Sequence, residues 1–210
     1  MRLVLLLAAL NFALPALAAE MLPTPIATAG KTAVAPALDG VLDDACWARA
    51  AAVLRGFVSL DGARSASPPT DARICWDDAR LYVGVRCVEP QIKSLLARCT
   101  ARDDGVWRDD CVELFLDTNL DRTSYYHVIV NSIGTVYDET VPGGPAWNAD
   151  LQVAARVGED EWTVELAIPW ADLGGAPEPG ATWGANVGRE RYAQTAALSA
   201  WSPTYGKFLV

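Results

Sequence analysis

The sequence predicts an all-β fold, an antiparallel two-sheet β-sandwich of the jelly-roll or immunoglobulin-like kind. The first observation is a series of about ten short runs that alternate apolar and polar residues or are rich in β-branched ones. The second is that turn signals such as WDDARL, VNSIGT, VGEDEW and PEPGAT separate these runs. The runs are 54–60, 70–76, 81–88, 111–117, 125–131, 135–140, 151–157, 162–168, 182–189 and 198–201.

The third observation is the lack of long helical patterns. Helical periodicity appears only over residues 44–51 and 92–98. Segments this short cannot serve as crossovers between parallel strands. We therefore expect neighbouring strands to pair in antiparallel fashion and to form two sheets packed face to face.

Residues 1–19 have the features of a secretory signal. A single positive charge, Arg2, precedes an apolar run, and small residues suited to cleavage follow near Ala18 or Ala19. The apolar run is too short to span a bilayer. We expect residues 20–31, rich in Ala, Thr, Pro and Gly, to form a tether. Residues 32–210 would then form one soluble domain, exported to the periplasm or out of the cell.

The mature chain is acidic. Removing residues 1–19 takes away one basic residue and no acidic one, so 17 minus 1 basic residues against 26 acidic ones leave a net charge of −10. Phosphate backbones and anionic lipids repel such a chain, which excludes nucleic acids and membranes as expected partners.

The chain has five cysteines, and in an oxidising compartment at least one of them stays unpaired. No C-x-x-C motif or neighbouring histidine points to a zinc or redox site, so core or disulfide thiols are expected. The sequence leaves their pairing open. The cysteines are Cys46, Cys75, Cys87, Cys99 and Cys111.

The stretch RDDGVWRDDCVELFLD, residues 102–117, places Trp107 between two acidic pairs just before an alternating run. A large aromatic residue in such a polar segment is either a plug that enters the core or a platform held out for a ligand. In the run that follows, the β pleat puts Val112, Leu114 and Leu116 on one face, expected to be core. Glu113 lies on the other face and is either an ordinary solvated residue or a ligand contact.

Trp147 lies, like Trp107, in a loop rich in glycine and proline, PGGPAWNAD. Loop tryptophans are candidate sugar platforms because the C–H groups of a sugar face stack on aromatic rings, while sugar hydroxyls need carboxylate, amide or guanidinium partners. Alternation predicts core positions for four other tryptophans, which are Trp47, Trp76, Trp162 and Trp183.

No catalytic constellation stands out in the sequence. Hydrolysis of a glycosidic bond requires two carboxyl groups roughly 5 to 10 Å apart, whereas about 13 Å of strand separates Glu113 from Asp117. Glu139 or Glu165 could approach one of them from another strand. The sole histidine, His127 in the apolar run YYHVIV, is expected to be structural. Nucleophile-elbow, zinc-protease and P-loop motifs are missing.

A calcium site is one interpretation of the turn DTNLDR. Asp117, Asn119 and Asp121 have the alternating oxygen-ligand spacing that begins calcium loops. The glycine and the bidentate glutamate of an EF-hand do not follow, so an ordinary hairpin turn is the alternative. We keep Asp117 and Asp121 as candidate calcium ligands beside that alternative.

Six segments, in this order, resemble the family 9 carbohydrate-binding modules and the wider set of domains similar to them. They are ALDGVLDDACW, ARICWDDARLYVGVRCVEP, VWRDDCVELFLD, YYHVIVNSIGTVYD, WTVELAIPWADLG and SAWSPT, and they cover about residues 32–204. The resemblance implies a β-sandwich that holds sugar, often as an accessory to glycan-degrading enzymes and often with structural calcium.

The resemblance also implies roles for particular residues. In the family, a tryptophan just before the V-E-x-F-x-D strand forms one wall of an aromatic clamp around a terminal sugar, and the strand's glutamate bonds to its hydroxyls. These roles fall on Trp107 and Glu113, and the acidic neighbours would keep the Trp107 loop solvated. The second clamp tryptophan follows S-W-S, where this chain has only Tyr205 nearby. The arginine that precedes V-N in sugar-binding members is replaced by Ile129, which cannot donate to a hydroxyl.

We therefore expect a secreted, non-catalytic carbohydrate-binding domain that assists glycan degradation. Its candidate ligand is a glycan or a sugar end, held by Trp107, Glu113, Tyr205 and Trp147. One alternative is a structural or interaction domain of a larger exported enzyme, in which Trp107 packs against a partner.

A more remote alternative is a haem-carrying electron-transfer domain, which needs axial methionine, histidine or lysine ligands. After cleavage only Met21, in the tether, and His127 remain as the methionine and histidine candidates. The resembling family continues past S-W-S with a last strand, and a chain ending at Val210 would leave a sheet edge unpaired. On that ground we expect the sequence to be a fragment, or the domain to be completed by a partner.

Overall fold

A computed structural model describes residues 22–49, 52–178, 180–206 and 208, so the expected signal peptide lies outside the described residues. The described chain forms two six-stranded sheets. Sheet A consists of β1 (Gly30–Lys31), β2 (Ala52–Leu54), β4 (Thr70–Trp76), β5 (Arg80–Val88), β9 (Gln152–Val157) and β10 (Glu161–Pro169). Sheet B consists of β3 (Val58–Ser59), β6 (Cys111–Asp117), β7 (Tyr125–Asn131), β8 (Val136–Val141), β11 (Gly184–Arg191) and β12 (Ala197–Ala200).

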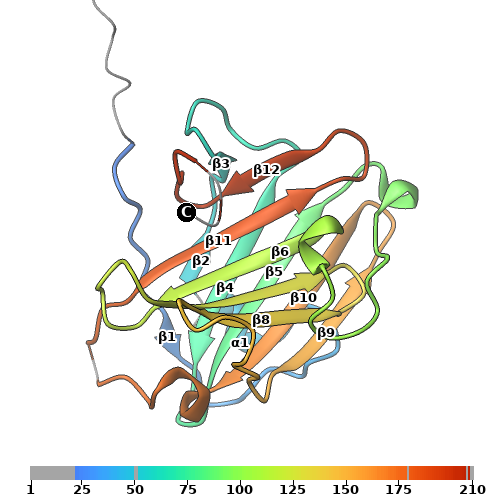
Figure 1. The fold of residues 1–210 in the computed structure, drawn as a ribbon. Helices are drawn as coiled ribbons and strands as arrows, with labels where there is room; N and C mark the ends of the chain where they lie inside the picture. The colour runs from blue at the N-terminus through green and yellow to red at the C-terminus, as the bar shows by residue number, and fades with distance from the viewer. Residues whose placement is uncertain (1–21, 50–51, 179, 207, 209–210) are drawn as a thin grey trace, which may run out of the picture.

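The two sheets pack face to face as a sandwich, which confirms the predicted fold class. Sheet A has the order β1–β4–β5–β10–β9 with β2 also paired to β4, and sheet B has the order β3–β12–β11–β6–β7–β8. In Figure 1, β11 and β6 of sheet B cross in front of β4 and β5 of sheet A. All strand pairs in the described chain are antiparallel except β1 with β4, which are parallel.

The expected strand over residues 54–60 is in fact two strands in different sheets. β2 ends at Leu54 in sheet A, and β3 begins at Val58 in sheet B. Between them Gly56 has a φ of 75°, a left-handed conformation that glycine adopts without steric cost. The chain therefore passes from sheet A to sheet B within residues 54–60, which the alternation of apolar and polar residues predicted to be one strand.

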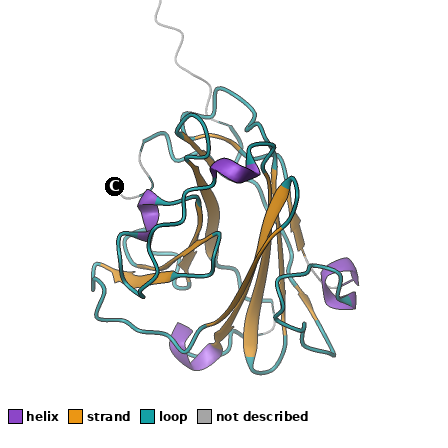
Figure 2. Cartoon of the chain, turned by 90° about the vertical axis from the view of Figure 1, so that its right-hand side faces the viewer, coloured by secondary structure: helices purple, strands orange, loops and turns teal. Residues whose placement is uncertain are grey.

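The helices are short, as expected. They are α1 (Ala45–Arg49) and the 3₁₀ turns η1 (Ile92–Ser94), η2 (Val106–Arg108) and η3 (Trp170–Leu173). The prediction of a helix over residues 92–98 is wrong beyond η1, because the backbone N–H groups of Leu96, Arg98 and Cys99 donate to the carboxylates of Asp109 and Asp110 instead. Figure 2 shows these helices outside the sheets. None of the described helices is long and apolar enough to cross a membrane.

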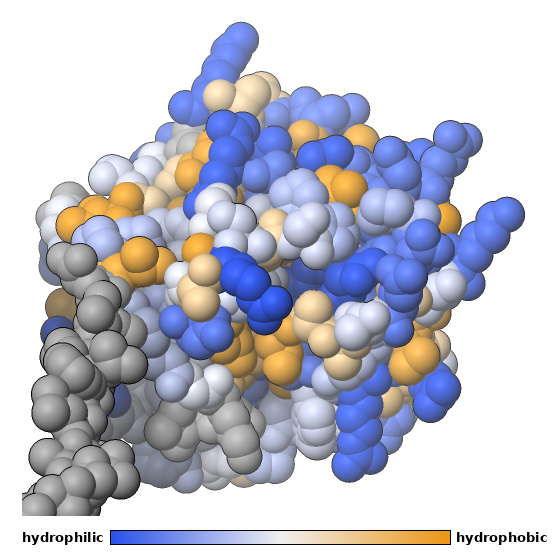
Figure 3. All heavy atoms as spheres, turned by 90° about the horizontal axis from the view of Figure 1, so that it is seen from above, coloured by the Kyte–Doolittle hydropathy of each residue, from blue (hydrophilic) through white to orange (hydrophobic). Residues whose placement is uncertain are grey.

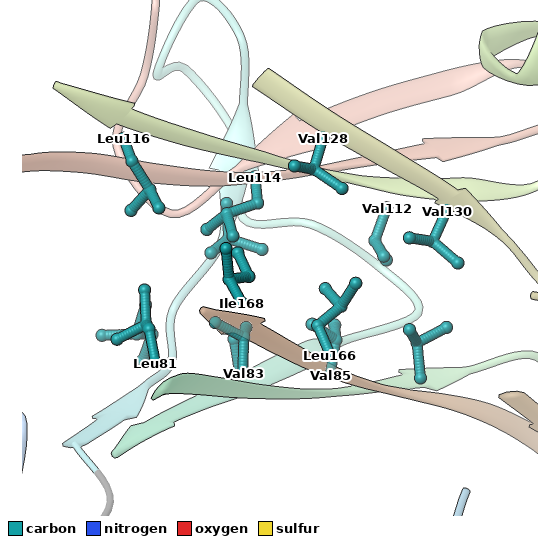
Figure 4. Packing of buried hydrophobic residues seen from close by; sticks show 14 of the residues in the cluster. Leu81, Val83, Val85, Val112, Leu114, Leu116, Val128, Val130, Leu166 and Ile168 are labelled. Atoms are coloured by element: carbon teal, nitrogen blue, oxygen red, sulfur yellow. The ribbon is translucent and has the colours of Figure 1, made fainter. Parts of the chain in front are cut away.

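The main core lies between the sheets. Alternate residues of β5, β10, β6 and β7 point inward, and Figure 4 shows them meeting from both sides. Val112, Leu114 and Leu116 are each at most 3% exposed, so the predicted core face of this strand is confirmed. Burial of such side chains contributes about 1.5 to 3 kcal/mol each. The end of the sandwich seen in Figure 3 carries scattered hydrophobic side chains among hydrophilic ones.

A second, smaller cluster covers the outer face of sheet A. It joins α1 to β4, β5 and β10 through Cys46, Trp47, Cys75, Tyr82 and Ala167. The indole nitrogen of Trp47 donates to Glu165 on β10, 2.9 Å away, and the N–H groups of residues 39 and 40 donate to the same carboxylate. Glu165 is therefore a structural hydrogen-bond acceptor on sheet A, whereas the candidate residue Glu113 lies on sheet B.

The stretch expected to be a tether contributes to the fold at its end. Gly30 and Lys31 form β1 beside Cys75 and Trp76 of β4. Thr32 continues the pairing, because its N–H donates to the carbonyl of Trp76 at 2.7 Å. Residues 30 and 31, which were expected to lie in the tether, thus pair with sheet A.

Candidate functional site

The outer face of sheet B carries two neighbouring rows of side chains that run across its strands. The first row is Tyr137 on β8, Ile129 on β7, Glu113 on β6 and Gly188 on β11. The second row is Glu139, His127, Phe115 and Asn186 on the same strands. Adjacent strands lie about 4.8 Å apart, so the two rows together bring polar or aromatic side chains of all four strands to one part of this face.

Trp107 stands beside the first row on η2. Its neighbour Val106 is fully buried against Cys111 and Ile129, which anchors the turn. The Trp107 ring is 38% exposed and meets the Tyr137 ring edge to face, with the ring centres 5.2 Å apart. The Arg108 guanidinium lies 5.8 Å from the Trp107 ring centre. Trp107 is therefore a partly exposed residue at the surface.

The acidic pair after Trp107 is structural. Asp109 and Asp110 are 1% and 0% exposed, so this pair does not keep the loop solvated as expected, whereas Asp103 and Asp104 before Trp107 are exposed. Asp110 accepts N–H bonds from Leu96 at 2.8 Å and from Tyr192 at 2.9 Å. Burial alone would raise the pKa of Asp109, but the N–H donors of Arg98 and neighbouring groups hold that pKa below its usual value. Both carboxylates fasten surrounding loops to the base of the Trp107 turn.

Glu113 lies in the floor of this face and is buried, only 2% exposed, which corrects the expectation of a solvent-facing position. Its Oε2 is 2.8 Å from Nε2 of His127, while its Oε1 is buried and receives no hydrogen bond from an N–H or hydroxyl group, and the Glu190 carboxyl group lies within hydrogen-bond reach of this carboxylate. Nδ1 of His127 lies 3.0 Å from Oε1 of Glu139. The Tyr137 hydroxyl donates to the other oxygen of Glu139, also at 3.0 Å. A continuous polar chain thus crosses three strands.

Glu190 on β11 extends this chain towards Trp107. Burial, and next the nearby Glu113 carboxylate, raise the pKa of Glu190 to about 8, so this side chain carries its proton at neutral pH. The Tyr192 hydroxyl is hydrogen-bonded to Glu190 and also lies 3.2 Å from the backbone carbonyl oxygen of Trp107. The aromatic platform and the acidic floor are therefore parts of one connected structure.

Phe208 is an aromatic residue of this face that sequence reasoning missed. Its ring rests on Gly188, where an added Cβ would come within 2.6 Å of it, and its centre lies 5.8 Å from that of Phe115. Gly188 pairs with Glu113 on the side away from Ile129 and Tyr137. Trp107 and Phe208 therefore flank Glu113. A glycine inside a strand signals close approach of another group, and Gly188 was the available clue.

Tyr205 and Trp147, the other predicted sugar contacts, are not brought to Glu113. The Tyr205 hydroxyl accepts the N–H of Leu22, and its own N–H donates to the carbonyl of Leu60. Trp147 packs against the core with its ring centre 5.0 Å from that of Tyr126. Tyr126 points to the core side of β7, opposite to His127.

The predicted calcium ligands do not form a ready-made cage. The Asp121 carboxylate accepts bonds from the N–H groups of Thr123 and Ser124, both at 2.7 Å, and Asp117 accepts the N–H of Arg122 at 2.9 Å. These donors occupy positions that Ca²⁺ would need, since it takes six to eight oxygens. Within the described ranges, no group of three or more His, Cys, Asp and Glu side chains could hold a metal ion.

The geometry around His127 does not support glycoside hydrolysis or haem binding. Glu139 shares a face with Glu113, but the His127 ring lies between them, bonded to both. A haem iron would have to displace one of these carboxylates, because both ring nitrogens of His127 are engaged. Two hollows of about 540 and 710 Å³ lie elsewhere, along β1 and α1, and their described linings contain no aromatic side chain. The outer face of sheet B remains the candidate site.

Comparison with known proteins adds three findings, the first of which is a family match. A family model described as "Carbohydrate family 9 binding domain-like" matches residues 38–195. The chain is 28% identical over 153 residues to endo-1,4-beta-xylanase A of Thermotoga neapolitana and 28% identical over 141 residues to exoglucanase XynX of Acetivibrio thermocellus. These matches cover 72% and 66% of this chain but only 14% and 12% of those proteins.

The third finding concerns solved structures. The fold is similar to that of a family 9 carbohydrate binding module from Caldicellulosiruptor kristjanssonii, solved in complex with glucose and in complex with cellotriose. The TM-scores are 0.58 and 0.57, each at 21% sequence identity. The alignments cover 82% and 80% of this chain and 88% and 78% of those chains. The likeness extends over most of both sandwiches.

Proposed function

Because the chain belongs to the carbohydrate family 9 binding domain-like family, we propose that it is a non-catalytic sugar-binding domain whose ligand site is the outer face of sheet B. The observation that carries this proposal is a row of side chains that has at one end Tyr137, on which the exposed Trp107 ring packs, and includes Glu113, whose Oε1 is buried without an N–H or hydroxyl donor. A buried acceptor that lacks a hydrogen bond costs about 1 to 3 kcal/mol. A sugar hydroxyl is a donor that would remove this cost while the sugar's C–H face stacks on the indole.

The side chains around Glu113 suggest how a sugar reaches it. Glu113 is almost fully covered in the free chain, so a neighbouring side chain has to move before a hydroxyl can approach Oε1. Phe208 reaches over Gly188 from outside the sheet and is the neighbour that we propose moves. After moving, its ring would line the sugar on the side opposite Trp107, the place that sequence reasoning gave to Tyr205.

The expected affinity is low. Stacking one sugar on Trp107 would remove about 100 Å² of apolar surface from water, worth about 2.5 kcal/mol at ~25 cal/mol per Å². Loss of translational freedom and displacement of Phe208 oppose this gain. We expect dissociation constants of about millimolar to tens of micromolar for cellotriose or glucose, the ligands named for the similar structures.

Affinity gel electrophoresis on a soluble β-glucan, with cellotriose as competitor, tests the proposal. We expect Trp107→Ala to abolish retention and Glu113→Gln to weaken it less, because the amide still offers hydrogen bonds. Tyr205→Ala is the matched control, since Tyr205 is similarly exposed at 43% but lies away from Glu113. Retention of Trp107→Ala at the wild-type level would refute this site, and unfolding of that variant would make Trp107 a core plug.

We also propose that the domain is exported and assists an enzyme that degrades glycans. The signal-like residues 1–19 support export, and the curated relatives, which are glycan-degrading enzymes by name, contain the matched region as a small part of their length. The alternative, an interaction domain in which Trp107 packs on a partner, predicts no retention on any glycan and burial of Trp107 in a complex. Fractionation of cells that produce the full chain tests export.

A further inference from the structure

We propose that His127 is the positioning residue of this site, because its ring holds Glu113 in the orientation that leaves Oε1 for a sugar hydroxyl. The inference rests on the proposed sugar site and adds to it a side chain that is fully buried and has no access to ligand. It also assigns Glu139 a function, as the group that holds the ring from its other side.

The geometry fixes the ring in all directions. Nε2 and Nδ1 lie 2.8 and 3.0 Å from oxygens of Glu113 and Glu139, on the two strands that flank β7. The Phe115 ring stacks on the imidazole with centres 4.4 Å apart and planes at 13°. Ring N–H groups donate and carboxylate oxygens accept, so the buried ring links two carboxylates on neighbouring strands.

Without this ring, Glu113 would lose the hydrogen bond that sets its orientation. Its remaining close neighbour in the chain of acids is the Glu190 carboxyl group. An apolar residue at position 127 would remove the ring donor from buried Glu113 and from Glu139, whose side chain is 12% exposed. Either side chain would then be able to rotate, and Oε1 would no longer be held in place for a ligand.

The chain offers an unusually clean probe, because His127 is its only histidine. Protein labelled with ¹⁵N-histidine and purified without a histidine tag gives ring nitrogen resonances from this residue alone. Glu113→Gln should move mainly the Nε2 resonance and Glu139→Gln mainly the Nδ1 resonance. Resonances unchanged in both variants would overturn the bridge itself, whatever the sugar results.

Binding measurements then test the positioning role. We expect His127→Phe to weaken cellotriose binding at least tenfold while circular dichroism stays that of a β-sandwich. His127→Gln should recover much of the loss, because its amide can still donate to Glu113. If His127→Phe binds like the wild type while Trp107→Ala does not, the sugar site stands and this inference fails. If the wild type binds neither cellotriose nor glucose, the proposed function fails and the positioning role fails with it.

A separate observation on sheet A carries a second inference. We propose that Cys46 and Cys75 form a disulfide that ties α1 to β4 in the exported protein. Both thiols are free and lie in the small cluster on the outer face of sheet A, where they are 5% and 0% exposed. The remaining cysteines lie in other clusters, Cys87 between the sheets and Cys111 with Cys99 beside Val106.

The oxidant would be a disulfide, either of a thiol oxidase or of a small molecule such as glutathione. One thiolate attacks the oxidant and forms a mixed disulfide, and the second displaces the oxidant's remaining thiol. The two protein thiols lose two protons and two electrons, and the oxidant becomes two thiols. Burial raises the pKa of Cys46 and raises that of Cys75 to about 12, so thiolate is scarce in the folded chain. The exchange therefore belongs to folding, before α1 docks.

Refolding of the mature chain in a glutathione buffer, followed by alkylation and non-reducing peptide mapping, tests this pairing. We expect one cross-linked peptide that joins residues 46 and 75, absent in Cys46→Ser and Cys75→Ser. Reduction should lower the melting temperature by on the order of 10 °C, because the bond closes a loop of about 30 residues. Alkylation of both residues in correctly folded, oxidised protein, or their pairing with other cysteines, would overturn the proposal.

Discussion

Glutamine at position 190 should make the domain more stable in alkali while leaving it unchanged in acid. Burial and the neighbouring Glu113 raise the pKa of Glu190 from its ordinary 4.5 to about 8. When folding raises the pKa of an acid, the stability that its protonated form contributes is fully present below the unfolded pKa and is lost as pH rises through the folded pKa. The free energy of unfolding therefore falls between about pH 4.5 and pH 8, by about 1.4 kcal/mol per pH unit. The largest loss in the wild type is about 3 to 5 kcal/mol.

Urea unfolding followed by tryptophan fluorescence at several pH values between 5 and 9 measures this effect. Glu190→Gln mimics the protonated acid, so its free energy of unfolding should match the wild type near pH 5 and exceed it by a few kcal/mol near pH 9. Glu159→Gln, at an exposed position, is the control and should show no such crossover. Parallel pH profiles for wild type and Glu190→Gln would refute the buried, protonated state of Glu190.

Three further outcomes follow from the same structure. Asp110→Asn should lower the free energy of unfolding by about 2 to 4 kcal/mol in urea titrations, because an amide cannot accept all the N–H bonds that Asp110 receives. Asp104→Asn, at an exposed position, is the control and should have little effect. Phe208→Ala should weaken cellotriose binding roughly tenfold by calorimetry, because the ring proposed to line the sugar opposite Trp107 is lost. Millimolar calcium, compared with a chelator, should not raise the melting temperature, because N–H donors occupy Oδ2 of Asp117 and Oδ1 of Asp121.

Much of the fold is predictable because one face of most strands is buried. Alternation located residues 70–76, 111–117 and 125–131 with the bounds that the structure has. It did not find the change of sheet at Gly56, since periodicity carries no information about which sheet receives a strand. The helix expected after residue 92 failed because two distant carboxylates compete for its backbone N–H groups. That competition exists only in the folded chain.

The candidate site was predictable only in part. The position of Trp107 before an alternating strand indicated a platform, and the pleat placed Glu113 on the outer face. The pattern did not reveal that Glu113 is buried, because its cover comes from residues outside its own strand. His127 was expected to be structural, and its bonds to two carboxylates depend on the register of β6, β7 and β8. The sequence alone does not show which residues of different strands lie side by side.

The central claim is that sugar binds on the outer face of sheet B, and a cellotriose titration followed in ¹H–¹⁵N spectra of the full mature chain tests it most directly. The account predicts progressive, saturable shifts for the Trp107 indole and for amides of Glu113, Ile129, Tyr137 and Gly188. Residues lining the hollows along β1 and α1 should not move. Shifts confined to those hollows, or no shifts at tens of millimolar cellotriose, would contradict the account.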